Sequence, residues 1–326
     1  MSNSYLENGW RQEMIACCEL MVQTDPYYDN VQLDVYNTDN TVEAQVASLE
    51  SLMEMGYDAF IIDCCSDSGL NNVIDQAVER GIVVVTFDSN ATTDSCYTLS
   101  LDYDAAFGLV GAVICEAIGG KGEIAMDQGI WSTSNGQGMY NGAKKGISYF
   151  PDVKVVAEYE GEWNDGINQD KVSTILATQH LDAVIGESHA ASIIKAFQTA
   201  GIDPVPTSGD VYNMNMCELY YGGCGATYTG LSIMALDTAL DVLNGNAPES
   251  KQIMIVPDAN IINADKIGVE TVEKWAQELG ATYVLAEEGK DFSKDWPEQF
   301  MWPCLPKSYP RQLEAQDLID YMGGVF

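Results

Sequence analysis

Basic residues are scarce in this chain. Lysine and arginine together number 15 against 49 acidic residues, which gives the 326-residue chain a formal net charge of −34 at pH 7. Such a charge repels polyanions, which argues against binding of nucleic acid or of an anionic membrane surface. Histidine occurs only twice, at His180 and His189. A zinc pattern would need more histidines beside the cysteines, so we expect no metal site, and we expect no cofactor.

Long apolar runs are also missing. No segment approaches the ~18 consecutive apolar residues of a membrane-spanning helix, and the N-terminus has no basic, apolar and small-residue signal pattern. A nucleophile elbow, a Walker loop and a dinucleotide fingerprint are absent as well. Gly136 and Gly138, followed by Gly142, have the wrong last spacing for a dinucleotide-binding loop. These absences argue against a doubly wound enzyme.

The chain has nine cysteines, so at least one is free or pairs with another chain. Cys17, Cys18 and Cys115 lie in segments with an amphipathic helical pattern, where a small apolar side chain in the core is the ordinary explanation. Cys217 and Cys224 flank a short segment and could form a local disulfide.

The chain is organised around the stretch from Tyr57 to Asn90. It contains a short apolar run, a polar loop, a segment with apolar residues at helical spacing, and a second apolar run over Ile82–Phe87. The second run is β-branched and lacks polar alternation, which is typical of a parallel strand covered on both faces. This pattern predicts a βαβ unit. Asp88 follows the second strand directly, where open α/β sheets place their ligands.

Six segments of the chain carry a resemblance in their order and spacing: Ser2–Arg11, Tyr57–Asp63, Ala77–Ser89, Gly119–Ile124, Glu160–Trp163 and Ala196–Gly201. Together they resemble the type I periplasmic solute-binding proteins of sugar ABC transporters, of the ribose- and galactofuranose-binding kind. The resemblance covers about residues 1–262. It implies a bacterial α/β protein of two Rossmann-like lobes, each with a parallel sheet, joined by a three-segment hinge that closes on a ligand.

The alternation of β and α elements through both halves of the chain agrees with two such lobes. The pattern predicts, among others, a strand over Val31–Tyr36 and helices over Ala190–Ala200, Leu231–Leu243 and Val269–Leu279. We expect an N-terminal lobe of residues 1–102 plus 231–256, and a C-terminal lobe of residues 103–230 plus 257–326 with an irregular tail. The chain would cross between the lobes at three places, near Leu101–Asp104, Tyr228–Leu231 and Val256–Asp258.

The N-terminus departs from the resemblance. Members of the family have an apolar first strand before the Ser2–Tyr5 loop, and a secretory or lipoprotein leader before that strand. This chain starts at Met1, inside the expected loop. We therefore expect a first sheet without its central strand, a coding region that extends upstream, and an extracytoplasmic location in the periplasm or as a membrane-anchored lipoprotein.

A site for a neutral sugar needs flat apolar faces, together with carboxylates, amides or guanidinium groups for the hydroxyls. By the resemblance, the candidates in the first lobe are Asn3, Tyr5, Asn8, Trp10, Arg11, Asp88 and Ser89. The structural alternatives are a packing role for Trp10, a surface position for Arg11 and a turn-capping role for Asp88. Ser89 stands where the family often has Arg.

The candidates in the second lobe follow strands or begin helices. They are Trp131, Ser134, Trp163, Asp165, Glu187, Asp210 and Tyr212. The family's Arg is absent before Gly142, where Met139 stands. For each candidate, capping a helix or solvating a loop is the structural alternative.

The resulting hypothesis is a monomeric extracytoplasmic binding protein, not an enzyme. It would capture a small polyhydroxylated solute, a sugar or polyol, in a cleft between the lobes and deliver it to ABC permease subunits. Two alternatives remain at this point: a doubly wound α/β enzyme, and the effector domain of a LacI-like regulator binding a small metabolite. The regulator is disfavoured because no DNA-binding motif precedes the fold and the charge is strongly negative.

Overall fold

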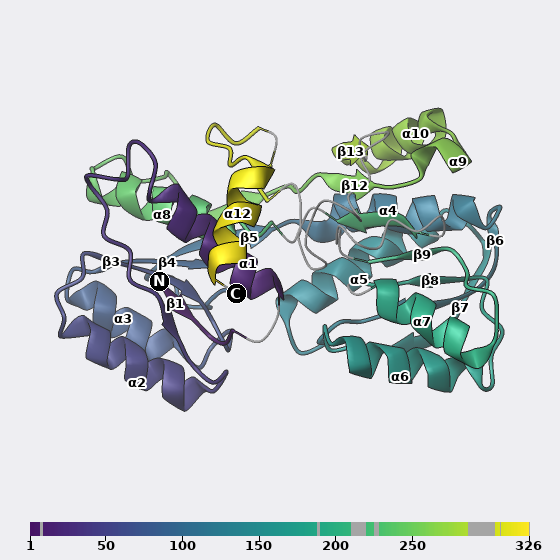
Figure 1. Ribbon diagram of the computed structural model, residues 1–326, viewed down its shortest axis with the longest axis horizontal. Helices are drawn as coiled ribbons and strands as arrows, with labels where there is room; N and C mark the ends of the chain where they lie inside the picture. Colours follow the sequence, from purple (N-terminus) through teal and green to yellow (C-terminus); the bar gives the residue numbers. More distant parts are fainter. Residues whose placement is uncertain are drawn as a thin grey trace. The chain divides into compact units, whose positions relative to one another are not determined.

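The computed structural model describes residues 1–6, 9–187, 190–209, 220–224, 228–285, 304–306 and 308–325. The chain forms two compact units (Figure 1). Unit 1 comprises Met1–Leu101, Tyr228–Ile255 and Pro303–Phe326, and unit 2 comprises Asp102–Thr227 and Val256–Trp302. The chain passes from one unit to the other after Leu101, Thr227, Ile255 and Trp302. Each unit is an α/β layer structure with its own sheet.

The sheet of unit 1 has six parallel strands in the order β11-β5-β4-β3-β1-β2. They are β1 (Ser2–Asn3), β2 (Tyr36–Asn37), β3 (Ala59–Asp63), β4 (Val83–Phe87), β5 (Tyr97–Leu101) and β11 (Gln252–Ile255). The two central apolar runs of the sequence, β3 and β4, pair in register from Ala59 against Val83. The predicted βαβ unit is therefore confirmed.

The expectation that this sheet lacks its central strand is wrong. β1 lies between β2 and β3 and pairs with both, Ser2 opposite Tyr36 and Ile62. A strand of two residues is enough to complete the sheet here, because β2 and β3 supply backbone hydrogen-bond partners on both of its sides. The short β1 also limits the length of β2, because in the described sheet β2 pairs only with β1. β2 covers Tyr36–Asn37, whereas the apolar run predicts a strand over Val31–Tyr36.

Helices cover both faces of this sheet (Figure 1). They are α1 (Gly9–Met21), α2 (Val42–Met53), α3 (Asn71–Glu79), α8 (Leu231–Leu243) and α12 (Ala315–Val325). Leu49, Ile62, Val73, Ile74 and Val84 belong to the core between the sheet and the α2–α3 layer. On the other face α8 packs on β3 and β4, and α1 packs on α8.

The last described segment belongs to unit 1, whereas the sequence reading assigns residues 257–326 to the C-terminal lobe. α12 packs against α1, and the Tyr321 hydroxyl donates a hydrogen bond to Glu19 Oε2 at 3.0 Å. This contact joins residues 302 positions apart in the chain, so no local sequence pattern predicts it.

The sheet of unit 2 has seven strands in the order β13-β12-β10-β9-β8-β6-β7. They are β6 (Lys121–Asp127), β7 (Asp152–Tyr159), β8 (Ala183–Ile185), β9 (Thr207–Ser208), β10 (Tyr220–Cys224), β12 (Ala259–Ile261) and β13 (Tyr283–Leu285). The sheet is parallel except for the pairing of β10 with β12, which is antiparallel. The expectation of a purely parallel second sheet is therefore wrong. Between β10 and β12 the chain passes through α8 and β11 of unit 1, so no βα crossover within unit 2 sets the direction of β12.

Unit 2 also carries helices on both sheet faces. They are α4 (Tyr103–Ala117), α5 (Ser134–Ile147), α6 (Asp165–Leu176), α7 (Ala190–Ala200), α9 (Ala264–Ile267) and α10 (Val269–Leu279). Strong local periodicity predicts the bounds of α7, α8 and α10, and the structure confirms them. Tyr159, Val172, Val184, Ile193 and Phe197 belong to the core beneath α6 and α7. Among the described residues, no helix is long and apolar enough to cross a membrane.

Candidate functional site

The strand orders define one topological switch point in each sheet. In unit 1, β2 lies on one side of β1 and β3 on the other, so the chain reverses its direction of winding between β1 and β3. In unit 2 the same holds for β7 and β8 around β6. Ligands of open α/β sheets bind outside the carboxyl ends of strands at such points. The polar residues at these two sheet edges are therefore the candidates for ligand binding.

A buried ion pair occupies the switch point of unit 1. Arg11, in the first turns of α1, hydrogen-bonds through Nη1 to Asp63 Oδ2 at the end of β3, and to Asn3 Oδ1 at 2.6 Å at the end of β1. The Asp63 side chain is fully buried and that of Arg11 is 8% exposed. Asn3 Nδ2 also donates to Asn37 Oδ1 at 2.8 Å, which joins the end of β2 to the network.

Aromatic rings surround the Arg11 guanidinium. Its Cζ atom lies 4.3 Å from the centroid of the half-buried Tyr5 ring and 6.0 Å from that of the buried Trp10 ring. At these distances the ring faces attract the cation. The surface position considered for Arg11 is thus wrong, because the fold surrounds this guanidinium with carboxylate, amide and aromatic groups.

Asp88 lies beside this pair. It follows β4 with φ of 55°, a left-handed conformation that Asp adopts more readily than most side chains, and it is half-buried. Asn90 fixes the turn, since its Nδ2 donates to Asp88 O at 3.1 Å and to Leu99 O at 2.9 Å. The charge of Asp88 acts on both Arg11 and Asp63.

The carboxylates of Asp63 and Asp88 thus both act on the Arg11 guanidinium, but Asp63 is fully buried and Asp88 is half-buried. Burial raises the pKa of Asp63 to about 7, Arg11 opposes this shift, and the charge of Asp88 adds to it. Asp63 Oδ1 is buried and has no partner of ordinary hydrogen-bond geometry in the described part of the chain. The Ser89 backbone also acts on this carboxyl. A buried acceptor at a switch point that lacks a hydrogen bond of good geometry is the kind of atom that a ligand hydroxyl can satisfy.

The structure therefore brings together five of the seven residues expected in the first lobe, namely Asn3, Tyr5, Trp10, Arg11 and Asp88. Ser89 follows Asp88, and its carbonyl accepts a hydrogen bond from Cys64 N at 3.0 Å. Asn8 lies outside the described residues. The sequence reading missed Asp63, which its place at the end of a strand beside the switch point could have indicated.

The switch point of unit 2 is built around another buried carboxylate, Asp127, the last residue of β6. Its Oδ1 accepts hydrogen bonds from Gly129 N at 2.9 Å and from Gly161 N at 2.8 Å. These contacts tie the loop after β6 to the loop after β7. A side chain at Gly161 would collide with the carboxylate, since an added Cβ would lie 2.6 Å from Asp127 Oδ2. Asp127 was not among the expected site residues.

Glu187 and Trp163 meet beside Gly129, whose backbone N–H donates to Asp127. Glu187 is buried after β8, and its Oε2 accepts a hydrogen bond from Trp163 Nε1 at 3.2 Å. Trp163 has φ of 50° and is half-buried. Gly129 makes the contact possible, because an added Cβ there would lie 2.0 Å from Glu187 Oε2 and 2.6 Å from Trp163 Nε1.

The remaining candidates of unit 2 stand at the start of helices or just before them. Trp131 is 38% exposed and contacts Tyr140 edge-on, with ring centroids 5.4 Å apart. Ser134 and Asp165 are exposed first residues of α5 and α6, next to the capping residues Thr133 and Asn164. Their ligand role stays a prediction. Asp210 and Tyr212 lie outside the described residues, as does Cys217 of the expected Cys217–Cys224 disulfide.

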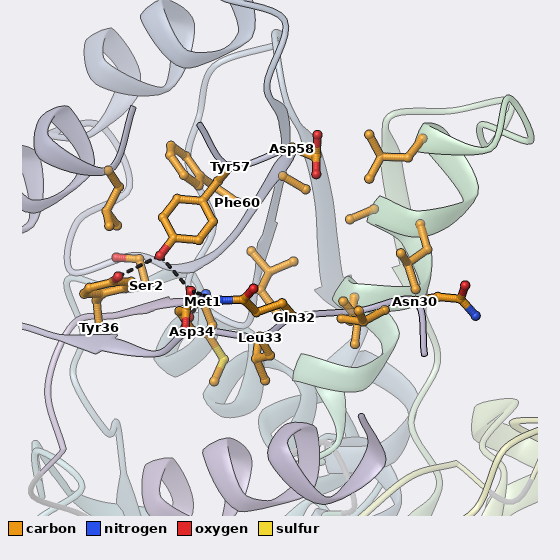
Figure 2. Close-up of a pocket in the computed structure, with 18 residues that line it drawn as sticks. Met1, Ser2, Asn30, Gln32, Leu33, Asp34, Tyr36, Tyr57, Asp58 and Phe60 are labelled. Atoms are coloured by element: carbon orange, nitrogen blue, oxygen red, sulfur yellow. Dashed lines mark hydrogen bonds between the residues drawn. The ribbon is translucent and has the colours of Figure 1, made fainter. Parts of the chain in front are cut away.

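A pocket in unit 1 lies at the opposite end of the same sheet (Figure 2). It is lined by the start of β3 and by Met1, Ser2 and one face of α8. The Tyr57 hydroxyl donates to Asp34 Oδ2 at 2.8 Å and lies 2.7 Å from the Tyr36 hydroxyl, as Figure 2 shows. This pocket faces the amino ends of the strands, so it is distinct from the site at the switch point.

Comparison with known proteins agrees with this fold. A family model described as "Periplasmic binding protein domain" matches residues 1–227. A xylitol-binding protein of Mycolicibacterium smegmatis is 24% identical over 186 residues, and the match spans 56% of this chain and about half, 53%, of that protein.

Solved structures are similar over most of the chain. An ABC transporter solute-binding protein of Thermobispora bispora has 26% identity and a TM-score of 0.69, covering 87% of this chain and 96% of its own. The periplasmic binding component of the arabinose ABC transporter of Shewanella sp. ANA-3, bound to α- and β-L-arabinofuranose, has 20% identity and a TM-score of 0.73, covering 86% and 96%. The latter likeness concerns the fold alone.

Proposed function

Because this chain belongs to the periplasmic binding protein domain family, we propose that it binds a small neutral polyhydroxylated solute, a sugar or polyol, and delivers it to an ABC permease. The family and the structural neighbours are binding proteins, and we assign no catalytic step to the residues of either unit. The observation that carries the proposal is the cluster of Asn3, Arg11, Asp63 and Asp88 at the switch point of unit 1, with the rings of Tyr5 and Trp10 beside it.

The chemistry of the cluster suits hydroxyl groups. Carboxylate oxygens accept from hydroxyls, amide and guanidinium groups donate to them, and aromatic faces pack on the C–H surfaces of a sugar ring. Asp63 Oδ1, buried without a partner of ordinary geometry among the described residues, would accept one such hydroxyl. A charge-assisted hydrogen bond of this kind contributes about 1.5–3 kcal/mol.

The charge balance of the cluster supports a neutral solute. Asp63 and Asp88 provide two carboxylates for the single guanidinium of Arg11. An anionic solute would find no net positive charge in this cluster, and it would meet a strongly acidic protein on approach. The name of the xylitol-binding relative agrees with a polyol as the solute.

The proposed role includes an extracytoplasmic location, in the periplasm or with a lipid anchor, and action as a monomer. Trp163 and Glu187 of unit 2 are proposed as further ligand contacts, together with Trp131, Ser134 and Asp165. Their support is their position at the carboxyl edge of the second sheet, where the Trp163 indole presents a half-buried ring.

Calorimetric titration with xylitol and with the neutral pentoses tests the proposal, and xylonate serves as the matched anionic control. We expect at least one neutral solute to bind, and xylonate to bind at least about tenfold more weakly than xylitol, a difference of ~1.4 kcal/mol. A thermal-shift screen gives an independent readout, since a ligand at 100 times its Kd adds about 2.7 kcal/mol to the free energy of unfolding. A folded protein that responds to no sugar or polyol in both assays would contradict the proposal.

A further inference from the structure

The segment 304–325 is anchored to unit 1 at several points. Asp237 of α8 is the main one: it accepts hydrogen bonds from the hydroxyls of Tyr27 and Tyr309, and from Arg311 Nη1 at 2.6 Å. The Arg311 guanidinium also lies 5.2 Å from the Tyr27 ring centroid. Figure 1 shows α12, the last helix of the segment, beside α1. The described residues of this segment therefore pack on α1 and α8 as part of unit 1.

Two cysteine thiols meet where this segment begins. Cys17 of α1 and Cys304 are both buried, with exposures of 0% and 1%. Their neighbours are consecutive residues of the turn before α8: Cys17 Sγ lies 3.5 Å from Thr229 Oγ1, and Gly230 N donates to Cys304 O at 2.8 Å. The two side chains also interact directly. Burial raises the pKa of the Cys17 thiol well above its usual value, and the contact with Cys304 raises it further.

The backbone of the turn before α8 approaches the backbone of Cys304 closely, and this approach depends on Gly230. A Cβ at this position would lie 2.6 Å from Cys304 O and from Leu305 Cδ2. The turn before α8 therefore runs directly against the backbone of Cys304. Cys18, the next residue of the helix, points elsewhere, since its Sγ contacts Ser232 O at 3.8 Å. The two adjacent cysteines of α1 therefore have different partners.

We propose that Cys17 and Cys304 are a disulfide-forming pair that locks the segment 304–325 onto unit 1. The proposal goes beyond solute binding, and it does not depend on the identity of the solute. Both thiols are reduced in this structure. An extracytoplasmic compartment would favour the oxidised form.

The reaction is a thiol–disulfide exchange with a disulfide donor such as oxidised glutathione. One cysteine thiolate attacks a donor sulfur, the donor S–S bond breaks, and one glutathione thiol leaves with a proton. The second cysteine thiolate then attacks the protein sulfur of the mixed disulfide and releases the second glutathione thiol. The two cysteines lose two electrons and two protons, and the donor gains both. Burial protects the thiols in the docked state, so exchange proceeds while the segment is transiently undocked.

The test uses the full chain, incubated with oxidised or reduced glutathione at a denaturant concentration just below the unfolding transition and then returned to buffer. Free thiols are alkylated, and a non-reducing digest is mapped by mass spectrometry. We expect a peptide pair joining the Cys17–Cys18 peptide to the Cys304 peptide. Cys18→Ala is the matched control: the link must persist in this variant and be absent in Cys17→Ala and Cys304→Ala.

Thermal unfolding provides the second measurement. The link closes a loop of almost the whole chain, so the oxidised form should melt about 5 °C or more above the reduced form. We expect the difference to persist in Cys18→Ala and to vanish in the other two variants. Complete alkylation of both Cys17 and Cys304 after oxidation, or a link from Cys304 to a different cysteine, would overturn the proposal. Because the mapping is done on the unaltered chain, a variant that fails to fold does not affect this outcome.

Discussion

Arg11 and Asp63 form a buried ion pair 52 residues apart in the chain, at the point where the sheet of unit 1 reverses its winding. The pair belongs to the proposed site, and it also bears on stability, because each charge is removed from water and compensated mainly by the other. Breaking a buried pair by removing one partner typically destabilises by about 3–5 kcal/mol, whereas replacing both partners by apolar side chains is often neutral.

We therefore expect Arg11→Met to lower the free energy of unfolding by about 3 kcal/mol, and the double variant Arg11→Met/Asp63→Leu to regain at least half of that loss. Urea denaturation above pH 7, where Asp63 is ionised in the folded state, measures both. Arg80→Met is the control, since Arg80 pairs with Glu54 at the surface, with exposures of 49% and 72%, and should change stability by less than ~1 kcal/mol. Equal effects of Arg11→Met and Arg80→Met would show that the buried pair has no special role.

Asp88→Asn tests the ligand role of the half-buried carboxylate. Asn tolerates the left-handed backbone at this position, so the fold should keep its stability within ~1 kcal/mol. Loss of a charge-assisted hydrogen bond should weaken solute binding by about tenfold to more than a hundredfold. Calorimetric titration and urea melts measure the two quantities. Asp94→Asn makes the same charge change at an exposed position of the same loop and should leave both unaltered. Unchanged affinity with lowered stability would identify Asp88 as a structural cap.

The raised pKa of Asp63 predicts a dependence of stability on pH. Its pKa is about 7 in the folded state and ~3.9 in an unfolded chain. Between these values the folded state holds a proton that the unfolded state has released, so the contribution of Asp63 is complete below about pH 4 and is lost as the pH rises to 7. We expect the free energy of unfolding to fall more steeply from pH 4 to pH 7 in the unaltered protein than in Asp63→Asn. Parallel pH profiles of the two proteins would contradict this prediction.

Gly129→Ala tests the packing of the Trp163–Glu187 contact. Gly129 has φ of 56°, and an added Cβ would lie 2.0 Å from Glu187 Oε2. Gly201 has φ of 69° with no atom within 4 Å of an added Cβ, so Gly201→Ala carries the backbone strain alone, about 1–2 kcal/mol. We expect Gly129→Ala to lower stability by at least about 2 kcal/mol more than Gly201→Ala, because the side chains of the contact must move. Trp163 fluorescence should change only in Gly129→Ala, and identical melts and spectra would refute the packing role.

The sequence by itself determined the elements whose signal is local. Apolar runs without polar alternation specify the parallel strands β3 and β4, because both faces are buried, and regular apolar spacing specifies α7, α8 and α10 to the residue. The end of a parallel strand marks where the chain leaves the sheet, so the sequence places Asp88 at the carboxyl edge of the sheet. Trp10 and Arg11 are candidates only through the resemblance, since neither has a periodic signal of its own.

Only the tertiary structure decided which distant residues meet. Asp63 joins Arg11, Asp127 receives the backbone of Gly129 and Gly161, and Cys304 reaches Cys17, and each of these contacts depends on strand order or on the return of the last segment to unit 1. A carboxylate looks the same in sequence whether it caps a turn or compensates a buried guanidinium. The difference lies in burial and in the partner, and both are set when the sheets assemble and elements far apart in the chain pack together.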